Sequence, residues 1–430
     1  MNERSGRIFY GWVIVFAATV ISGMTMAMAG FNFGFFIKPM GDDLGISRQT
    51  FGWAISIRQV AAASTMFWAG SLIDRRGARS TLLFAAVATC VCMVGLSYTE
   101  DGFQLLVLFV VMGALGMVGP GALAVSVPVA KWFVIKRGKA MAFWAVGTPV
   151  GAIIFVPVTQ QLIEAFGWRD AWLILAAVSF AVVVPLALLV RRQPEDMGLL
   201  PDGLNAGQRA ATIDHPAHSE ASWTVREAIR NVAFWRLVAV FSLVQLGMSS
   251  VGLHRIPHFT DQGISPRLVS FATSSDAAGA ALSTFAMGML IQRFPSRYVG
   301  AAGFSVLGLA VFLTIVADNV PMMFVAMITF GLGAGGMILL QNFLWAAYFG
   351  RAHVGAIRGA ALPMTLVFSA AGPPVAGAVQ DATGSYNPVW WVGMALMFTG
   401  ALILFLTPPP RKDEQPAERV PATALPATGG

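Results

Sequence analysis

The chain carries one short motif twice, with the copies half a chain length apart. Residues 70–79 read GSLIDRRGAR and residues 288–297 read GMLIQRFPSR, so that Gly, Leu, Ile and two Arg recur at a constant offset (288 − 70 = 218). This spacing is called the repeat offset below. A second pair follows at a slightly larger offset, because RGKA at residues 137–140 is matched by RGAA at 358–361. A chain that repeats itself once at half length is a duplicated unit rather than two unrelated domains. Where such a unit spans a membrane, a shared site is expected where the two copies meet.

The composition indicates that the duplicated unit lies in lipid. Apolar residues make up 56% of the 430-residue chain and charged residues 11%, whereas soluble domains carry charge on about a quarter of their residues. A helix needs about 20 apolar residues to cross the hydrocarbon core. The sequence therefore predicts an all-α membrane protein with twelve transmembrane helices in two pseudo-symmetric six-helix bundles, over residues 10–37, 49–73, 79–98, 102–131, 139–166, 168–190, 231–254, 268–292, 297–316, 320–349, 356–381 and 388–407.

The polar segments set the domain boundaries and the orientation. We expect an N-terminal six-helix bundle over residues 1–190, a cytoplasmic linker over 191–230, a C-terminal six-helix bundle over 231–407 and a disordered cytoplasmic tail over 408–430. Placing both termini in the cytoplasm assigns 22 Lys and Arg residues to that side and five to the other. Because insertion retains basic loops in the cytoplasm, we predict a multi-pass protein of the inner (plasma) membrane with both termini inside.

Several other classes of protein are disfavoured. The net charge is +7, but the basic residues lie in short turns between apolar runs rather than along one face, which argues against nucleic-acid binding. Cys90 and Cys92 lie inside an apolar run and supply neither a disulfide framework nor a metal site. The sequence contains no catalytic Ser/His/Asp set, no paired membrane carboxylates and no Walker loop, so we expect no enzyme activity, cofactor or metal.

Two charged residues, Arg58 and Asp276, fall well inside predicted helices. They are separated by the repeat offset, so the duplication relates them, and each costs about 2.5–3.5 kcal/mol to insert unless it faces a cavity or a partner. In one reading, Arg58 binds the carboxylate of an anionic substrate and Asp276 takes up a proton. In a second, both residues help to close an outer gate. In a third, Arg58 extends to the interface and Asp276 is packed.

The motif at residues 70–79 resembles the cytoplasmic loop motif of the major facilitator superfamily, between helices two and three. Its degenerate copy falls between helices eight and nine, as the duplication in that family requires. Shorter segments resemble bacterial carriers related to monocarboxylate and oxalate/formate transporters; they are residues 11–15, 137–140, 167–169, 194–203 and 348–351.

The resemblance implies alternating access, in which two six-helix bundles rock around a central site. By analogy, the first motif copy latches the cytoplasmic side through Asp74, Arg75 and Arg79. The second copy, with Arg293 and Arg297, lacks the carboxylate and is expected to form a weaker latch. A purely topological role for these arginines is the alternative.

The resemblance also indicates which polar residues line the centre. Each is a candidate substrate contact or a hydrogen bond between helices; they are Asn32, Gln245, Ser249, Gln341, Asn342 and Trp345. At the outer end of the seventh helix, His254 and His258 flank Arg255, where a role in the response to pH and an interfacial location are both open.

One departure from the family concerns helices one and eight. Animal monocarboxylate carriers have a Lys in helix one and an Asp–Arg couple in helix eight. Here the apolar body of the first helix has no Lys, and the eighth has Asp276 without an Arg. Lactate–proton symport by that machinery is therefore not expected.

These observations lead to one functional prediction and one alternative. We predict secondary active transport of a small, monocarboxylate-like organic anion across the lipid bilayer, with a proton as the candidate coupling ion. The alternative is export of hydrophobic or amphipathic compounds, which the 21 Met and 31 Phe would suit.

Overall fold

The computed structural model describes residues 9–28, 30–117, 121–133, 136–191, 193–200, 202, 223–350 and 353–410. Within these residues the regular structure is helical throughout. The first half contains α1 Tyr10–Met24, η1 Thr25–Met28, α2 Gly30–Leu44, α3 Arg48–Arg76, α4 Ala78–Ser97, α5 Gly102–Leu115, α6 Ala122–Trp132 and α7 Arg137–Leu189. A short η3, Pro194–Met197, follows. The second half contains α9 Val225–Arg230, α10 Val232–Gly252, α11 Arg255–Asp261, α12 Pro266–Arg293, α13 Ser296–Val316, α14 Val320–Phe349, α15 Val354–Thr383 and α16 Asn387–Phe405.

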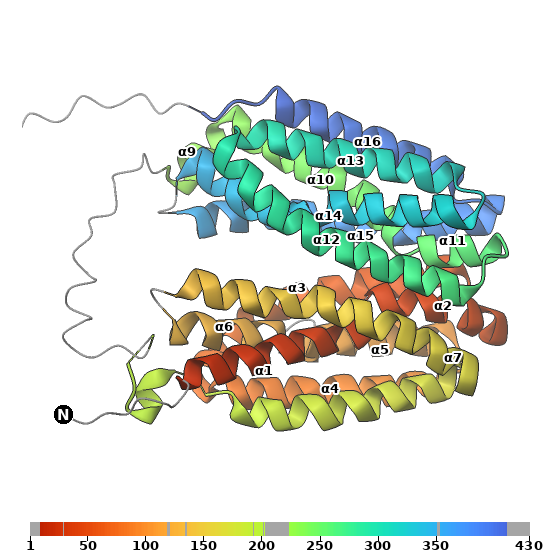
Figure 1. Ribbon diagram of the computed structural model, residues 1–430, viewed down its shortest axis with the longest axis horizontal. Helices are drawn as coiled ribbons and strands as arrows, with labels where there is room; N and C mark the ends of the chain where they lie inside the picture. Colours follow the sequence, from red (N-terminus) through yellow and green to blue (C-terminus); the bar gives the residue numbers. More distant parts are fainter. Residues whose placement is uncertain are drawn as a thin grey trace, which may run out of the picture.

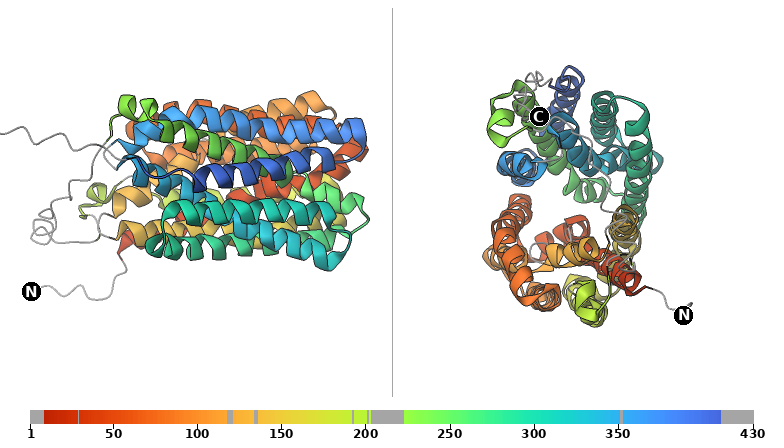
Figure 2. Two further views of the ribbon diagram at one scale, coloured as in Figure 1. Left: turned by 90° about the horizontal axis from the view of Figure 1, so that it is seen from above. Right: turned by 90° about the vertical axis from the view of Figure 1, so that its left-hand side faces the viewer.

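The helices form two bundles that lie side by side (Figures 1 and 2). One buried core runs from Ile14 to Val190 with Leu253 added, and a second runs from Ala228 to Leu404. Each half thus has an apolar core of its own. Below, the end of the molecule where the chain passes from α7 to α9 is called the linker end, and the opposite end, with α11, is called the far end.

The long helix α7 contains a reversal of chain direction at Gly167. Gly167 has φ 79° and ψ 168°, which lies outside the helical region and is accessible to glycine because it has no Cβ. Before the reversal, Gly147 packs on Thr19 and Gly151 on Gly23, whereas after it Trp172 stacks on Phe36 and Leu189 accepts a hydrogen bond from Tyr10. The two segments therefore run in opposite directions, as expected for the fifth and sixth predicted helices.

Several predicted helix boundaries were wrong. The first predicted helix is interrupted by η1, directly after Gly23 packs against the backbone of Gly147 and Gly151. The fourth is divided into α5 and α6 at Gly116, where the freed N–H of Met117 donates to Thr89 Oγ1 (2.9 Å). The seventh ends at Gly252, and after a two-residue turn the separate helix α11 continues to Asp261.

The helical fold in two halves is confirmed, whereas the number of spans stays a prediction. Among the described residues, eight stretches are long and apolar enough to cross a membrane, and one of them, Lys139–Leu189, includes the reversal in α7. Helices α3 and α12 have 29 and 28 residues and carry the buried charges Arg58 and Asp276.

The duplication is visible in the packing of glycines. A Cβ on Gly113 of α5 would collide with the backbone carbonyl of Arg58 in α3, and a Cβ on Gly331 of α14 would collide with that of Asp276 in α12. The repeat offset separates Gly113 from Gly331, and it also separates Arg58 from Asp276. The crossings of α3 with α5 and of α12 with α14 are therefore equivalent, and the absence of a side chain lets each pair of backbones approach.

We expect Gly331→Ala to lower the free energy of unfolding by about 1–3 kcal/mol, because overpacking of a close contact costs this much. Thermal unfolding in detergent measures the effect. Gly288→Ala on the facing helix is the control, since the nearest atom to its added Cβ is 3.9 Å away. Equal melting temperatures for the two variants would contradict the close contact.

Candidate functional site

The two halves meet along a seam at the far end, formed by α3 against α15 and by α7 against α12. A Cβ on Gly52 of α3 would lie 2.5 Å from the carbonyl of Pro373 in α15, and one on Gly377 of α15 would lie 2.6 Å from the backbone of Arg48. Hydrogen bonds and ion pairs that join described residues of different halves lie at this end of the helices. The seam therefore closes the far end.

Two serines at equivalent positions hydrogen-bond across the seam. Ser56 Oγ of α3 donates to the carbonyl of Ala370 in α15 (2.5 Å), and Ser274 Oγ of α12 donates to the carbonyl of Ile153 in α7 (3.3 Å). The serines are related by the repeat offset, and both are buried. Each lies two residues before a buried charge, Arg58 or Asp276. Because residues two positions apart on a helix point in nearly opposite directions, these charges face α5 and α14 of their own halves rather than the seam.

Asp276 forms a buried ion pair with Arg255 at the start of α11. Arg255 Nη2 donates to Asp276 Oδ2 at 2.6 Å, with side-chain exposures of 1% and 4%. The guanidinium lies over the ring of Phe330, with Cζ 3.8 Å from the ring centroid. Among the described residues, Nε and Nη1 of Arg255 have no hydrogen-bond partner. The pair thus keeps donor capacity in a buried position.

Arg58 lies in the equivalent position of the first half. It is 5% exposed, and its Cζ is 5.5 Å from the ring centroid of Phe109 in α5. The repeat offset relates Arg58 to Asp276 as residues of opposite sign at equivalent positions, and the partner of Asp276 is Arg255 of its own half. A buried carboxylate needs a nearby cation, which α11 supplies.

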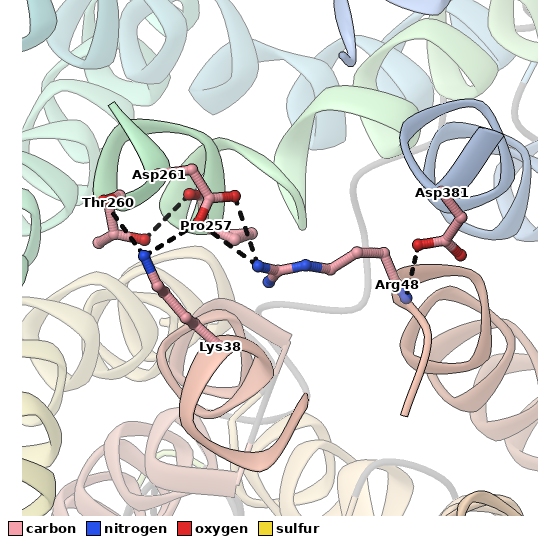
Figure 3. A network of polar contacts seen from close by, with 6 residues as sticks. All are labelled: Lys38, Arg48, Pro257, Thr260, Asp261 and Asp381. Atoms are coloured by element: carbon pink, nitrogen blue, oxygen red, sulfur yellow. Dashed lines mark hydrogen bonds and ion pairs between the residues drawn. The ribbon is translucent and has the colours of Figure 1, made fainter. Parts of the chain in front are cut away.

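Carboxylates of the second half meet cations of the first at the far end (Figure 3). Asp261 accepts from Lys38 Nζ (3.1 Å) and from Arg48 Nη2 (3.4 Å). Asp381 accepts from the backbone N–H groups of Arg48 (3.1 Å) and Gln49 (2.9 Å), which begin α3. The first half supplies the donors of these contacts, and the second half supplies the carboxylates.

His254 and His258 pack against aromatic residues of the second half. His254 is fully buried, with Nε2 2.8 Å from the carbonyl of Pro373, and it stacks on Tyr386. His258 packs edge-on against Trp390. Burial raises the pKa of the Tyr386 hydroxyl well above its usual range, so this neighbour stays neutral.

Three of the predicted cavity residues lie on the first and seventh predicted helices. Asn32 is fully buried and donates to Thr159 Oγ1 (2.8 Å) within the first half, while its Oδ1 has no partner among the described residues. Gln245 is partly buried with an Oε1 that likewise lacks a described partner. Ser249 donates to the carbonyl of Leu246 in its own helix (3.2 Å). The hydrogen bonds described for Asn32 and Ser249 therefore join two helices or lie within one helix.

The other three lie on α14. Trp345 is 3% exposed and packs among Phe234, Phe241 and Phe349 in the second core. Gln341 is partly buried, and the side chain of Asn342 lies outside the described part of the structure. Trp345 thus contributes to packing, and contact of any of the three with substrate stays a prediction.

The predicted cytoplasmic gate is described only in part. The backbone of α3 extends through Asp74 and Arg75, but the side chains of both lie outside the described residues. Arg79 is partly buried at the start of α4, Arg293 is exposed, and Arg297 donates to Tyr298 Oη (2.7 Å). The roles of these residues in gating stay predictions.

Sequence reasoning missed the residues that hold the far end together. In the sequence Arg255 lies just beyond the end of the seventh predicted helix, so no partner in the eighth helix is expected for it; its position between two histidines is the available signal. The pairing of Asp261 and Asp381 with the first half depends on tertiary structure and has no local signature.

Known structures with the same fold were found at low sequence identity. A D-xylose-proton symporter superposes with a TM-score of 0.71 at 13% identity, covering 93% of this chain and 99% of the symporter. A bacterial homologue of the lysosomal transporter Spinster, inward-facing and unoccupied, gives a TM-score of 0.65 at 14% identity, covering 94% and 96%. At these identities the likeness shows the fold alone.

Sequence relatives cover most of the chain. Monocarboxylate transporter 11 of Mus musculus is 24% identical over 417 residues, which is 92% of this chain and 86% of the relative. Monocarboxylate transporter 4 of Rattus norvegicus is 23% identical over 404 residues, covering 92% and 83%. The oxalate:formate antiporter of Oxalobacter formigenes is 22% identical over 269 residues, covering 62% and 59%.

The family model of the Major Facilitator Superfamily matches residues 15–262 and 255–428. These two matches cover nearly the whole of both halves, in agreement with the duplication and with the helical fold. The protein is therefore a membrane transporter and not an enzyme. The chain belongs to the Major Facilitator Superfamily.

Proposed function

We propose that the protein is a secondary active transporter that moves a small, monocarboxylate-like organic anion by alternating access of its two halves. Relatives named as monocarboxylate transporters and as an oxalate:formate antiporter support this class of substrate. Two halves with separate cores, joined by a seam at the far end, support movement of one half against the other.

The observation that carries the proposal is the Arg255–Asp276 pair beside the seam. A guanidinium has five N–H donors, and a buried one with a single carboxylate oxygen at hydrogen-bond distance is under-satisfied. A substrate carboxylate would fill this need, because it offers two acceptor oxygens and a negative charge. Arg255 thus supplies, from the end of the seventh helix, the arginine that the eighth helix lacks.

Arg58 is the matching cation on the first half. It lies two residues beyond Ser56, as Asp276 lies two residues beyond Ser274, so each charge is at the same level along its helix as a hydrogen bond across the seam, on the face toward its own half. We propose that an anion between the halves is held by Arg58 from one side and by Arg255 from the other. In this arrangement each half contributes a cation, and movement of one half would alter the site.

Proton coupling follows from competition for Arg255. If the substrate carboxylate replaces Asp276 as the partner of the guanidinium, Asp276 becomes a buried carboxylate without a cation. Such a group takes up a proton rather than remain charged in a low-dielectric site. We therefore propose Asp276 as the group that carries a coupled proton.

The distribution of basic residues supports an orientation with the linker end in the cytoplasm of a cell with an inner (plasma) membrane. The far end then faces outward, and the seam represents an outward-closed state. The motif residues Asp74, Arg75 and Arg79, with Arg293 and Arg297, lie at the linker end and would form the opposite gate.

Uptake into proteoliposomes, over a panel of labelled small carboxylates with and without a pH gradient, tests the proposal. We expect Arg58→Ala and Asp276→Asn each to reduce uptake by about tenfold or more, since hydrogen bonds to charged groups are worth roughly 1.5–3 kcal/mol. The exposed residues Arg267 and Asp170 provide controls as Arg267→Ala and Asp170→Asn. Wild-type uptake by both test variants would disprove the charged site, and uptake of amphipathic compounds alone would favour the export alternative.

A double-mutant cycle separates a structural from a functional role for the ion pair. Arg255→Gln alone should lower the free energy of unfolding by about 3–5 kcal/mol, because it leaves Asp276 buried without a cation. Adding Asp276→Asn should restore most of the thermal stability but not carboxylate uptake. Recovery of uptake together with stability would mean that the pair is structural.

A further inference from the structure

We propose that Asp261 and Asp381 form a charged latch between the halves that holds the far end closed. The inference rests on the proposed alternating access, but it does not depend on which anion is carried. It assigns the two carboxylates as positioning residues, which act on the transport site by setting the relation between the halves.

In the latch, the hydrogen-bond donors come from the first half and the carboxylates from the second (Figure 3). Lys38, Arg48 and the first N–H groups of α3 belong to the first half, whereas Asp261 and Asp381 belong to the second. Each contact named is therefore broken when the halves separate at this point. The side chains of Lys38, Arg48 and Asp261 are 40%, 17% and 33% exposed, so water can replace the lost partners.

Asp381 takes over part of the capping of α3. The helix begins after Ser47, whose Oγ accepts from the N–H of Thr50 (3.2 Å). The N–H groups of Arg48 and Gln49 precede that bond, and both carboxylate oxygens of Asp381 accept from them. A carboxylate at a helix N-terminus is favoured by the unpaired donors and by the helix dipole. Closure of the seam thus completes the first turn of a long helix in the other half.

The duplication reproduces the residue types but not the latch. Asp43 precedes Asp261 by the repeat offset, yet it pairs with Arg169 of its own half. Glu164 is the equivalent of Asp381, because the two are separated by one position less than the repeat offset, the same separation as between Ile153 and Ala370 in the seam. Glu164, however, accepts a hydrogen bond from Gln160 of its own helix. Asp43 and Glu164 are thus the equivalents of Asp261 and Asp381, but their contacts stay within the first half. They serve as controls that distinguish the latch from the general effect of removing a charge at the far end.

An apolar cluster joins the halves on the same helices as part of the latch. Phe35 and Val156 of the first half form one buried cluster with Ile256, Phe259 and Val269 of the second. Phe35 shares α2 with Lys38, and Phe259 shares α11 with Asp261, so opening the far end also exposes apolar surface to water, which has no compensating interaction. The charged contacts exchange for hydration, and their loss therefore lowers the cost of opening without removing the apolar contact.

Distances between spin labels in the full-length protein, reconstituted in nanodiscs without substrate, test the latch. One pair replaces Glu100 and Asp318 at the far end, and a second replaces Ser80 and Tyr298 at the linker end; these positions are exposed, and the repeat offset relates the members of each pair. Both pairs are introduced in a Cys90→Ala/Cys92→Ala background, which removes the native thiols.

We expect Asp261→Asn and Asp381→Asn each to raise the ratio of long to short distances at the far end by about tenfold, which corresponds to about 1.4 kcal/mol, with shortening at the linker end. Asp43→Asn and Glu164→Gln are the matched controls and should leave both distributions unchanged. Lys38→Gln combined with Arg48→Gln removes the partners from the other half and should act like Asp261→Asn, which guards against a folding defect of one variant.

The latch would be overturned if the far-end distances were unchanged in both latch variants while added carboxylate still shifted the distances in the parent protein. The proposed transport by alternating access would not be affected by that result. Equal shifts in the latch variants and the controls would also overturn it. A single distance at both ends in every variant and with every carboxylate would contradict alternating access itself, and the latch with it.

Discussion

The structure depends on keeping a buried charge paired close to the surface where its two halves meet. Asp276 and Arg255 are almost fully enclosed, and the cost of leaving either without a partner is about 3–5 kcal/mol. Both belong to the second half, so the pair does not depend on contact between the halves. The contacts that cross the seam are of other kinds, namely serine hydroxyls to carbonyls, partly exposed ion pairs and an apolar cluster. The residues that form the buried ion pair within one half are thus different from the residues that form the contacts between the halves.

The duplication explains much of this arrangement, and its departures from symmetry are where function is expected. Equivalent glycines bring α5 onto α3 and α14 onto α12, and equivalent serines join the two sides of the seam. The residues that follow those serines differ, with Arg58 in one half and Asp276 in the other. A symmetric framework that carries Arg58 in one half and Asp276 in the other is asymmetric in charge, which suits the proposed binding of an anion and a proton by different groups.

The sequence predicted the fold from features that act locally. Apolar length predicted the helices, and the repeat offset related Arg58 to Asp276 and Gly113 to Gly331. It did not predict the breaks after Gly23 and Gly116, since these arise where helices cross. It also missed Arg255 as the partner of Asp276, because α11 brings two residues 21 positions apart together only after the seventh helix is broken. Trp345 was expected to line a central cavity; it packs among phenylalanines of the second core, and its contact with substrate stays a prediction.

The central claim is that a substrate carboxylate is held beside the seam by the guanidinium groups of Arg58 and Arg255, within reach of Asp276. A cryo-electron microscopy structure in nanodiscs, with the carboxylate that proteoliposomes take up most rapidly, tests this claim directly. The account predicts ligand density within hydrogen-bond distance of the Arg255 guanidinium, with Asp276 displaced from Nη2. Density in contact with neither arginine, with the Arg255–Asp276 bond retained, would contradict it.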